Sequence, residues 1–237
     1  MNLILVSQQD FIDTDIVLLT DRRFEHIRHI HQAQLGQSLS VALINDKIGT
    51  GVVLAIDDAS VTLRLELTEQ PPSALNLTLI LALPRPKMLK RILQNVSALG
   101  VKDIYLINSY KVDKSYWSTP ILQPLAAQAE LQLGLEQAVD SHMPNIYLKK
   151  RFKPFVEDEL SEIASNSRKL VAHPYQSAPC PRANHDQTTL VIGPEGGFIE
   201  YEVDKLQQLG FSSISLGHRI LKVETAIAVA IAKLCVF

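Results

Sequence analysis

The chain is organised around residues 189–237, which read TLVIGPEGGFIEYEVDKLQQLGFSSISLGHRILKVETAIAVAIAKLCVF. The short apolar run at residues 190–192 is typical of a buried strand. Residues 193–197, which we call the first glycine loop, contain three glycines and a proline and cannot continue that strand. Because glycine has no Cβ, the backbone of this loop can approach a ligand closely.

The same pattern occurs once more before the chain ends. A helical pattern stops at Gly210, and residues 214–216 form another short strand-like run. Residues 217–222, the second glycine loop, then lead into a final helix that is apolar nearly all round, which predicts burial. Open α/β sheets bind ligands at the carboxyl ends of their strands, so we expect the two loops to lie side by side in a binding site. The alternative is that both are only tight turns between packed elements.

Composition places the chain among ordinary globular proteins. It has 237 residues, of which 46% are hydrophobic and 20% charged, enough for one large or two small domains. No apolar run approaches the roughly 20 residues that span a bilayer, and the first residues lack the basic start of a secretory signal. We therefore expect a cytoplasmic protein with no membrane partner, in which Cys180 and Cys235 are free thiols.

Charge is spread unevenly over the chain, whose net charge is −2. Residues 1–70 contain five Lys and Arg against ten Asp and Glu, a net charge of −5, and the remainder contains 18 against 15, a net charge of +3. Neither part has the strongly basic composition typical of nucleic-acid binding. An RNA-binding function would therefore depend on local patches.

Residues 1–70 are predicted to form a small β-rich domain. One helix, over residues 22–34, interrupts the strands, with Asp21 as its N-cap, Gly36 after its end and Ile30 on its inner side. Residues 70–73, QPPS, indicate a linker. The expected strands cover residues 16–19, 39–44, 51–56 and 61–67, with turn residues at 45–49 and 57–58.

Residues 74–237 alternate between strand and helix patterns, which predicts an α/β domain with a largely parallel sheet covered on both faces. Residues 175–187 are expected to form a loop without regular structure. The expected strands cover residues 77–83, 104–107, 145–148, 170–172, 190–192 and 214–216. The expected helices begin at Pro86, at Thr119-Pro120 (running to about residue 139), at residue 153 (running to 164), near residue 203 and at residue 223.

Two groups of cations are candidates for RNA binding, because Arg and Lys pair with phosphates and imidazoles can stack on bases. Either group could instead be a solvated helix face. The histidines lack a matching Cys or carboxylate pattern, so no metal site is expected. The first group is Arg22, Arg23, His26 and His29, and the second is Arg85, Lys87, Lys90 and Arg91.

Motifs of several enzyme classes are missing from the sequence. It contains neither the phosphate-binding pattern G-x-x-x-x-G-K-[ST] nor the dinucleotide fingerprint G-x-G-x-x-G, and no G-x-S-x-G elbow occurs. A binding site built from backbone is what remains: the two glycine loops and the predicted strand end at His173-Pro174.

The two loops carry a family resemblance. Residues 193–197 and 216–226 resemble the SPOUT class of RNA methyltransferases, and within it the family that methylates N3 of a uridine in small-subunit (16S) ribosomal RNA. Residues 99–101, Glu136-Gln137 with Pro144 after them, and His173-Pro174 fall where that family has similar motifs. Its domain order also matches, with a small PUA-like β-barrel, here residues 1–70, before the methyltransferase domain, here residues 74–237.

The resemblance implies a fold and a site. Residues 189–237 would contain a deep trefoil knot that holds S-adenosylmethionine bent, in a homodimer. Arg219 would stabilise negative charge on a uracil carbonyl, and Glu195 or Glu224 would either accept the N3 proton or orient a loop; the target base must be unpaired or flipped out. The implied cofactor-binding residues are His173, Ile192, Gly193, Glu195, Gly196, Gly197, Leu216, Gly217, Ile220, Leu221, Lys222, Thr225 and Ala226.

The chain also departs from the family pattern. Asn95 and Ala98 stand where Lys and Glu are usual, and Asp140 and Lys222 lie where Arg is usual. Two alternatives therefore stay open: a non-catalytic RNA-binding or ribosome-assembly protein on the same fold, and a SPOUT methyltransferase with a different RNA target.

Overall fold

The computed structural model describes residues 2–175 and 177–236. Met1, Phe237 and Gln176, the last within the predicted loop 175–187, lie outside the described residues. The chain divides into two compact units. The first consists of Met1–Ser73 and Leu131–Met143, and the second of Ala74–Glu130 and Pro144–Phe237. No feature of the sequence indicates that Leu131–Met143 groups with the first unit.

The first unit is built on a five-stranded sheet with the order β1-β3-β4-β5-β2. β1 and β3 are parallel and the other neighbours are antiparallel. Alternate residues of these strands are buried and pack against the apolar side of α1, around Phe24 and Ile27. The strands are β1 (Ile4–Val6), β2 (Ile16–Leu19), β3 (Ser38–Leu43), β4 (Ile48–Ile56) and β5 (Val61–Glu69). β1 was not predicted, and β4 begins within the predicted turn.

Helix α1 (Arg22–His29) is shorter than predicted. Asp21 caps it as expected, because its side chain accepts a hydrogen bond from the backbone N–H of Arg23. The helix does not continue to residue 34, since Gln32 adopts a left-handed φ of 50° that reverses the chain. The prediction that Ile30 lies on the inner side is wrong: it follows the last helical residue and is 69% exposed.

Arg23 is held by two carboxylates of the first unit. Its guanidinium lies 2.7 Å from Asp10 and 2.8 Å from Asp21, and it also donates to the carbonyl oxygen of Leu5. Burial raises the pKa of Asp10, but hydrogen bonds from Arg23 and Ser7 outweigh this effect and leave that pKa below its ordinary value. The Arg23 and Asp10 side chains are only 12% and 13% exposed, so this pair belongs to the interior of the fold.

Replacing Arg23 with Met leaves the Asp10 carboxylate without its main partner. We expect the free energy of unfolding at pH 7, measured by urea denaturation, to fall by about 2–4 kcal/mol. Because the folded pKa of Asp10 is lowered, the loss shrinks as the pH falls below about 4. Arg64→Met is the control, since the Arg64–Asp15 pair at 3.8 Å is more than half exposed and contributes less than about 1 kcal/mol. Equal losses in both variants would contradict this account.

The second unit contains a seven-stranded sheet with the order β10-β12-β9-β11-β6-β7-β8. Every pairing in it is parallel, which confirms the predicted largely parallel sheet. All residues of β6 and β11 are buried, as expected for continuous apolar strands covered on both faces. The strands are β6 (Leu77–Ala82), β7 (Asp103–Ile107), β8 (Asn145–Lys149), β9 (Arg168–Ala172), β10 (Ala178–Pro179), β11 (Thr188–Ile192) and β12 (Ser212–Ser215).

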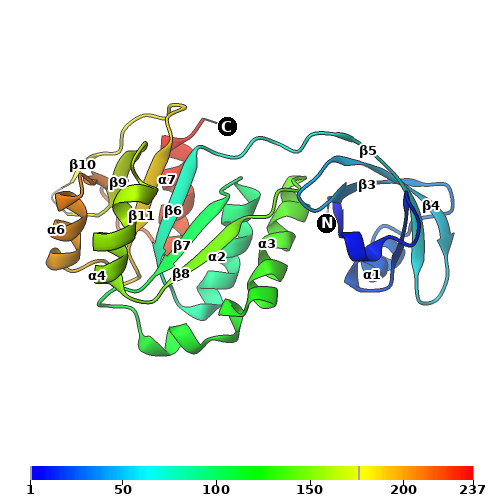
Figure 1. Cartoon of the computed structure of the whole chain (residues 1–237), viewed down its shortest axis with the longest axis horizontal. Coiled ribbons are helices and arrows are strands. Elements are labelled where there is room, and N and C mark those ends of the chain that lie inside the picture. The colour runs from blue at the N-terminus through cyan, green and yellow to red at the C-terminus, as the bar shows by residue number, and fades with distance from the viewer. Residues whose placement is uncertain (1, 176, 237) are drawn as a thin grey trace. The chain divides into compact units, whose positions relative to one another are not determined.

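Helices cover both faces of this sheet. In Figure 1, α2 and α7 lie behind the sheet, in contact with each other, and α4 lies in front of it. None of the helices in the described ranges is long and apolar enough to cross a membrane. Both cysteines are free thiols, as predicted. The helices that lie wholly in this unit are α2 (Pro86–Ala98), α4 (Phe152–Pro154), a π-helical turn (Phe155–Glu159), α5 (Leu160–Ile163), α6 (Glu200–Gln208) and α7 (Val223–Leu234). Helix α3 (Pro124–Ala138) begins in this unit, and its residues from Leu131 onward belong to the first unit.

Three predictions for this unit need correction. The helix expected from Thr119-Pro120 begins only at Pro124, after two 3₁₀ turns. Pro120 opens the second of these turns and Pro124 opens α3, because proline suits the first position of a helix. The helix expected over residues 153–164 is divided, because the π-helical turn Phe155–Glu159 separates α4 from α5. The expected loop 175–187 contains β10, which pairs with β12.

Candidate active site

Three strand ends meet at one edge of the parallel sheet. Ala172 of β9 is in register with Ile192 of β11 on one side and with Ile214 of β12 on the other. The first glycine loop follows β11, the second follows β12, and His173 follows β9. The two loops therefore flank His173 instead of being direct neighbours, because β9 lies between their strands.

Side chains and backbone from the neighbouring strand ends hold the first glycine loop. Glu195 Oε1 accepts a hydrogen bond from the backbone N–H of Arg85, which follows β6, at 3.0 Å. Lys111, which follows β7, donates from Nζ to the carbonyl oxygen of Gly196 at 2.8 Å. A Cβ atom at Gly196 would lie only 2.9 Å from Lys111 Cδ, so a side chain at this position would displace the Lys111 side chain. Gly197 has a left-handed φ of 68°.

Glu202, in the first turn of α6, ties this loop to the segment after β7. The carboxylate is 2% exposed, and it accepts from the backbone N–H of Tyr110 at 2.7 Å and of Ile199 at 3.1 Å. Two hydrogen bonds offset the desolvation of a buried carboxylate. Ile199 itself has no side-chain acceptor, so only the Glu202 half of a capping box is present.

The second glycine loop presents its backbone to solvent. Gly217 has a φ of 139°, and a Cβ there would meet no heavy atom within 4 Å. Among the residues that the structure describes, the N–H groups of residues 218–222 have no hydrogen-bond acceptor. Lys222, the N-cap of α7, makes no side-chain cap either. The loop and the first turn of α7 thus offer a row of unpaired donors to a ligand.

His173 lies between the loops and is half-buried. Its backbone N–H donates to the carbonyl oxygen of Ile214 at 3.0 Å, and its ring meets that of Tyr175 edge-on, with centroids 5.9 Å apart. Burial lowers the pKa of His173, and the positive charge of Lys111 lowers it further. The neutral imidazole is therefore favoured near pH 7, where it can both donate and accept a hydrogen bond.

The remaining predicted site residues belong to the same edge and differ in exposure. Arg219 is exposed and, within the described ranges, its side chain has no partner. Glu224 is half-buried and also without a described partner. Ile192 and Gly193 are buried, Leu216, Leu221 and Ala226 are half-buried, and Lys222, Thr225 and Ile220, the last 75% exposed, face solvent.

The first predicted RNA-binding group is not a free cationic face. The Arg23 guanidinium, one of its members, is paired with Asp10 and Asp21 and its side chain is largely buried. Arg22 binds both carboxylate oxygens of the buried Glu136, at 2.9 and 2.6 Å. His29 lies 3.1 Å from Glu25, and the His26 ring contacts that of His31.

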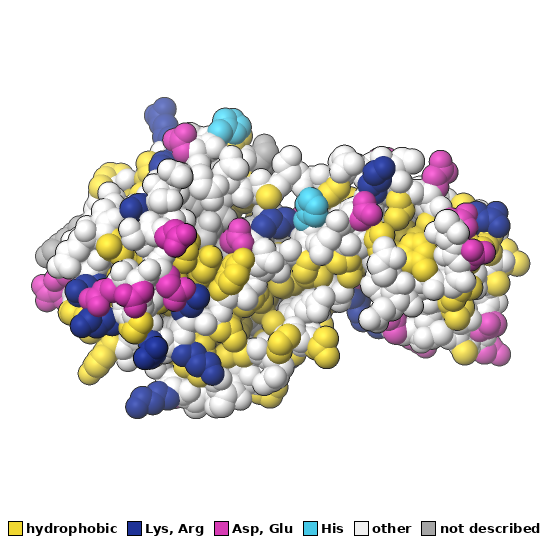
Figure 2. Space-filling view, in the orientation of Figure 1, with side chains coloured by type: hydrophobic (Ala, Val, Ile, Leu, Met, Phe, Trp, Pro, Cys, Tyr) yellow, Lys and Arg dark blue, Asp and Glu magenta, His cyan; other side chains and the backbone are white. Residues whose placement is uncertain are grey.

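The second predicted group lies at the start of α2 and is exposed throughout. Of Arg85, Lys87, Lys90 and Arg91, Lys90 lies 3.6 Å from Glu130. The group begins directly after β6, so it starts at the edge that carries the glycine loops. In Figure 2, Lys and Arg side chains gather on the second unit around α4, next to a band of acidic side chains.

Lys111, Tyr110 and Glu202 were missed by the sequence reasoning. Lys111 is separated from Gly196 by 85 residues, and Tyr110 from Glu202 by 92, so no local pattern links them. A signal was nevertheless present. Residues 108–111 follow a predicted strand of the sheet, and polar residues at that position belong to the binding edge.

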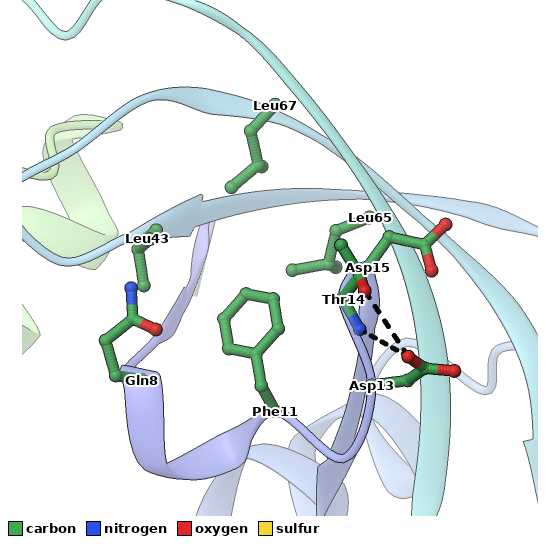
Figure 3. Close-up of a pocket in the computed structure, with 8 residues that line it drawn as sticks. All are labelled: Gln8, Phe11, Asp13, Thr14, Asp15, Leu43, Leu65 and Leu67. Atoms are coloured by element: carbon green, nitrogen blue, oxygen red, sulfur yellow. Dashed lines mark hydrogen bonds between the residues drawn. The ribbon is translucent and has the colours of Figure 1, made fainter.

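A pocket of about 460 Å³ opens on the first unit (Figure 3). The Phe11 ring and three leucines form its apolar part, and acidic and amide side chains stand around it. It contains none of the predicted site residues and no cation, so it does not compete with the sheet edge as the catalytic centre. The lining residues are Gln8, Phe11, Asp13, Thr14, Asp15, Leu43, Leu65 and Leu67.

The chain is similar in sequence to RNA methyltransferases. A family model described as an RNA methyltransferase domain matches residues 71–235. The chain is 27% identical to ribosomal RNA small subunit methyltransferase E of Treponema pallidum, covering 98% of this chain and 90% of that protein. It is 24% identical to ribosomal RNA small subunit methyltransferase E 1 of Borreliella burgdorferi, covering 95% and 94%.

A solved structure shares the fold. The crystal structure of a ribosomal RNA small subunit methyltransferase E from Neisseria gonorrhoeae, bound to S-adenosyl methionine, matches with a TM-score of 0.74. The match covers 97% of this chain and 95% of that chain, at 20% identity.

Replacing Lys111 with Met removes the positive charge that acts on His173. We expect the pKa of His173, measured by NMR titration of the imidazole, to rise while remaining below its ordinary value, because burial still disfavours the charged form. Lys114→Met is the matched control on the same segment and should leave that pKa unchanged. An unchanged pKa in Lys111→Met would mean that the two groups do not interact.

Proposed function

Because the chain belongs to the RNA methyltransferase domain family, we propose that it transfers a methyl group from S-adenosylmethionine to N3 of a uridine in small-subunit ribosomal RNA. The observation that carries the proposal is the pair of glycine loops flanking His173 at the carboxyl edge of the parallel sheet. The relatives named as small-subunit rRNA methyltransferases cover nearly the whole chain and support the choice of substrate.

The residues of the edge fit S-adenosylmethionine. Open space beside Gly197 and Gly217 leaves room for a ligand against both loops. The unpaired N–H groups of residues 218–222 suit the acceptor nitrogens of an adenine, and the exposed Ile220 offers apolar contact. We assign the cofactor to the residues that the family resemblance implies: His173, Ile192, Gly193, Glu195, Gly196, Gly197, Leu216, Gly217, Ile220, Leu221, Lys222, Thr225 and Ala226. Bound there, it supplies a sulfonium methyl that is electrophilic without further activation.

The chain's own residues must make uridine N3 a nucleophile. N3 carries a proton and attacks the methyl only as that proton leaves. Arg219, exposed and without a described partner, stabilises the negative charge that develops on the uracil carbonyl oxygens. We assign proton acceptance to Glu224, whose carboxylate has no described partner, whereas Glu195 orients the first glycine loop through its bond to Arg85.

The finer features of the family are also proposed for this chain. The first unit would be a PUA-like RNA-binding domain, and residues 189–237 would form a trefoil knot. β9 precedes both β11 and β12 in the chain yet lies between them, so the segment after β11 crosses β9, which supports such threading.

Exposed alanines on α7 support a homodimer contact there. We place the protein in the cytoplasm, where ribosomal RNA is its substrate.

Gly196→Val tests the cofactor site. The valine side chain would displace the Lys111 side chain, which disturbs the hydrogen bond from Lys111 Nζ to the Gly196 carbonyl oxygen, and it would also add bulk at the ligand side of the loop. In titration calorimetry we expect the wild type to bind S-adenosylmethionine with micromolar affinity and Gly196→Val to lose binding. Arg219→Ala should retain binding while its methyl transfer to small-subunit rRNA falls by about 10²–10³.

Gly36→Ala is the control for Gly196→Val, because it strains a glycine with a φ of 78° in the first unit, where no cofactor residue lies. It should bind S-adenosylmethionine like the wild type. A folded wild type that binds no S-adenosylmethionine would contradict the enzyme proposal and favour the non-catalytic RNA-binding protein.

Glu224→Gln and Glu195→Gln separate the two glutamates. Gln at 224 cannot accept the N3 proton, so the single-turnover rate of methyl transfer should fall by about 10²–10⁴ with unchanged cofactor affinity. Gln at 195 keeps an amide oxygen for the Arg85 N–H and should lower the rate by less than about tenfold. The reverse order of effects would exchange the assigned roles.

A further inference from the structure

The ends of β7 and β8 carry a group of cations outside the site described above. Residues 149–153 read KKRFK, four cations in five residues. Ile107 of β7 is in register with Lys149 of β8, and the N–H of Asn108 donates to the carbonyl oxygen of Lys149 at 3.0 Å. The segments that follow these strands therefore leave the sheet together, at the edge that carries the glycine loops.

Some of these cations have carboxylate partners and others do not. Lys149 binds Glu159, and Lys153 lies 4.0 Å from Glu157. Lys150 and Arg151 are exposed, and within the described ranges neither side chain has an acidic partner. Lys114, on the segment after β7, is likewise exposed without one. Unneutralised cations gathered on one edge attract a polyanion.

An exposed aromatic residue, Tyr110, follows β7 at the same sheet edge as these cations. Tyr110 is 78% exposed, which is unusual for so large an apolar surface, and its backbone is held by the buried carboxylate of Glu202. On the same segment, the Trp117 indole N–H donates to Asn108 at 3.0 Å, which fixes the loop further. An exposed aromatic ring on an anchored backbone, at the same sheet edge as exposed cations, is a combination that binds single-stranded nucleic acid.

We propose that Tyr110, Lys114, Lys150 and Arg151, here called the Tyr110 surface, bind the substrate RNA as a single strand. Tyr110 stacks on a base next to the target nucleotide, and the three cations contact the phosphates. This inference rests on the proposed function. It adds a contact with RNA that is made by the second unit, the same unit that carries the glycine loops. A single strand is the form required, because N3 of a paired uridine is hidden.

The test is binding of a fluorescein-labelled single-stranded oligouridine by the full chain, followed by anisotropy at several salt concentrations. Lys150→Ala/Arg151→Ala should lower the slope of log affinity against log salt by about 1.4, because each phosphate contact on a single strand contributes about 0.7. Tyr110→Ala should weaken binding by about 5- to 100-fold, whereas Tyr110→Phe keeps the stacking ring and should bind within about twofold of the wild type.

The matched control is Arg182→Ala/Lys233→Ala. It removes the same charge from exposed residues at the opposite edge, where Arg168, the first residue of β9, binds the carbonyl oxygens of Arg182 and Leu234. The proposal is overturned if the two double variants have equal slopes, if Tyr110→Ala binds like the wild type, or if the wild type does not bind the oligouridine. Calorimetry with S-adenosylmethionine on every variant tests the fold and the proposed function separately.

Discussion

The candidate site depends on one buried carboxylate. Glu202 is desolvated inside the second unit, and its two hydrogen bonds go to backbone N–H groups of two different segments. One segment follows β7 and the other begins α6, so the carboxylate fixes the far end of the first glycine loop against the sheet. Lys111, which follows β7, and Arg85, which follows β6, then hold the middle of the loop. The loop is thus shaped before any ligand arrives.

A parallel sheet that is buried on both faces leaves only its edge for chemistry. β6 and β11 have no exposed residue, so they cannot present a side chain to a substrate. What the edge presents is mainly backbone: the glycines of two loops and the unpaired N–H groups before α7. Such a site recognises a ligand by shape and by hydrogen bonds to the main chain. Few side chains at this edge are therefore available for the chemistry itself. Arg219 and Glu224 are the two to which we assign catalytic roles.

The sequence predicted those parts of the fold that depend on local pattern. The strands at residues 77–82, 104–107 and 190–192 were found because a buried strand is a continuous apolar run. The end of α1 was missed, because a left-handed Gln32 gives no such signal. The position of β9 between β11 and β12 could not be predicted, since strand order is decided by contacts between distant segments.

The candidate site, like the fold, was predicted only in those parts that depend on local pattern. The glycine loops were visible as motifs, and the family resemblance supplied roles for their residues. The contacts that hold them were not visible, because Lys111 and Glu202 act on segments more than 80 residues away. The ion pairs of Arg22 and Arg23 were also missed. A helical pattern indicates which cations share a face of the helix, but it does not indicate which carboxylates lie opposite that face.

The first unit is assembled from two separate stretches of chain, and this has a consequence for synthesis. Leu135 is fully buried in a cluster with Leu3, Leu5 and Ala42, and Asn45 accepts a hydrogen bond from Met143. When the first 73 residues have left the ribosome, the surface that receives Leu131–Met143 is still bare. The first unit is therefore completed only after the segment that ends at Met143 has been translated. Until then the nascent chain carries an uncovered leucine face, the kind of surface that chaperones bind.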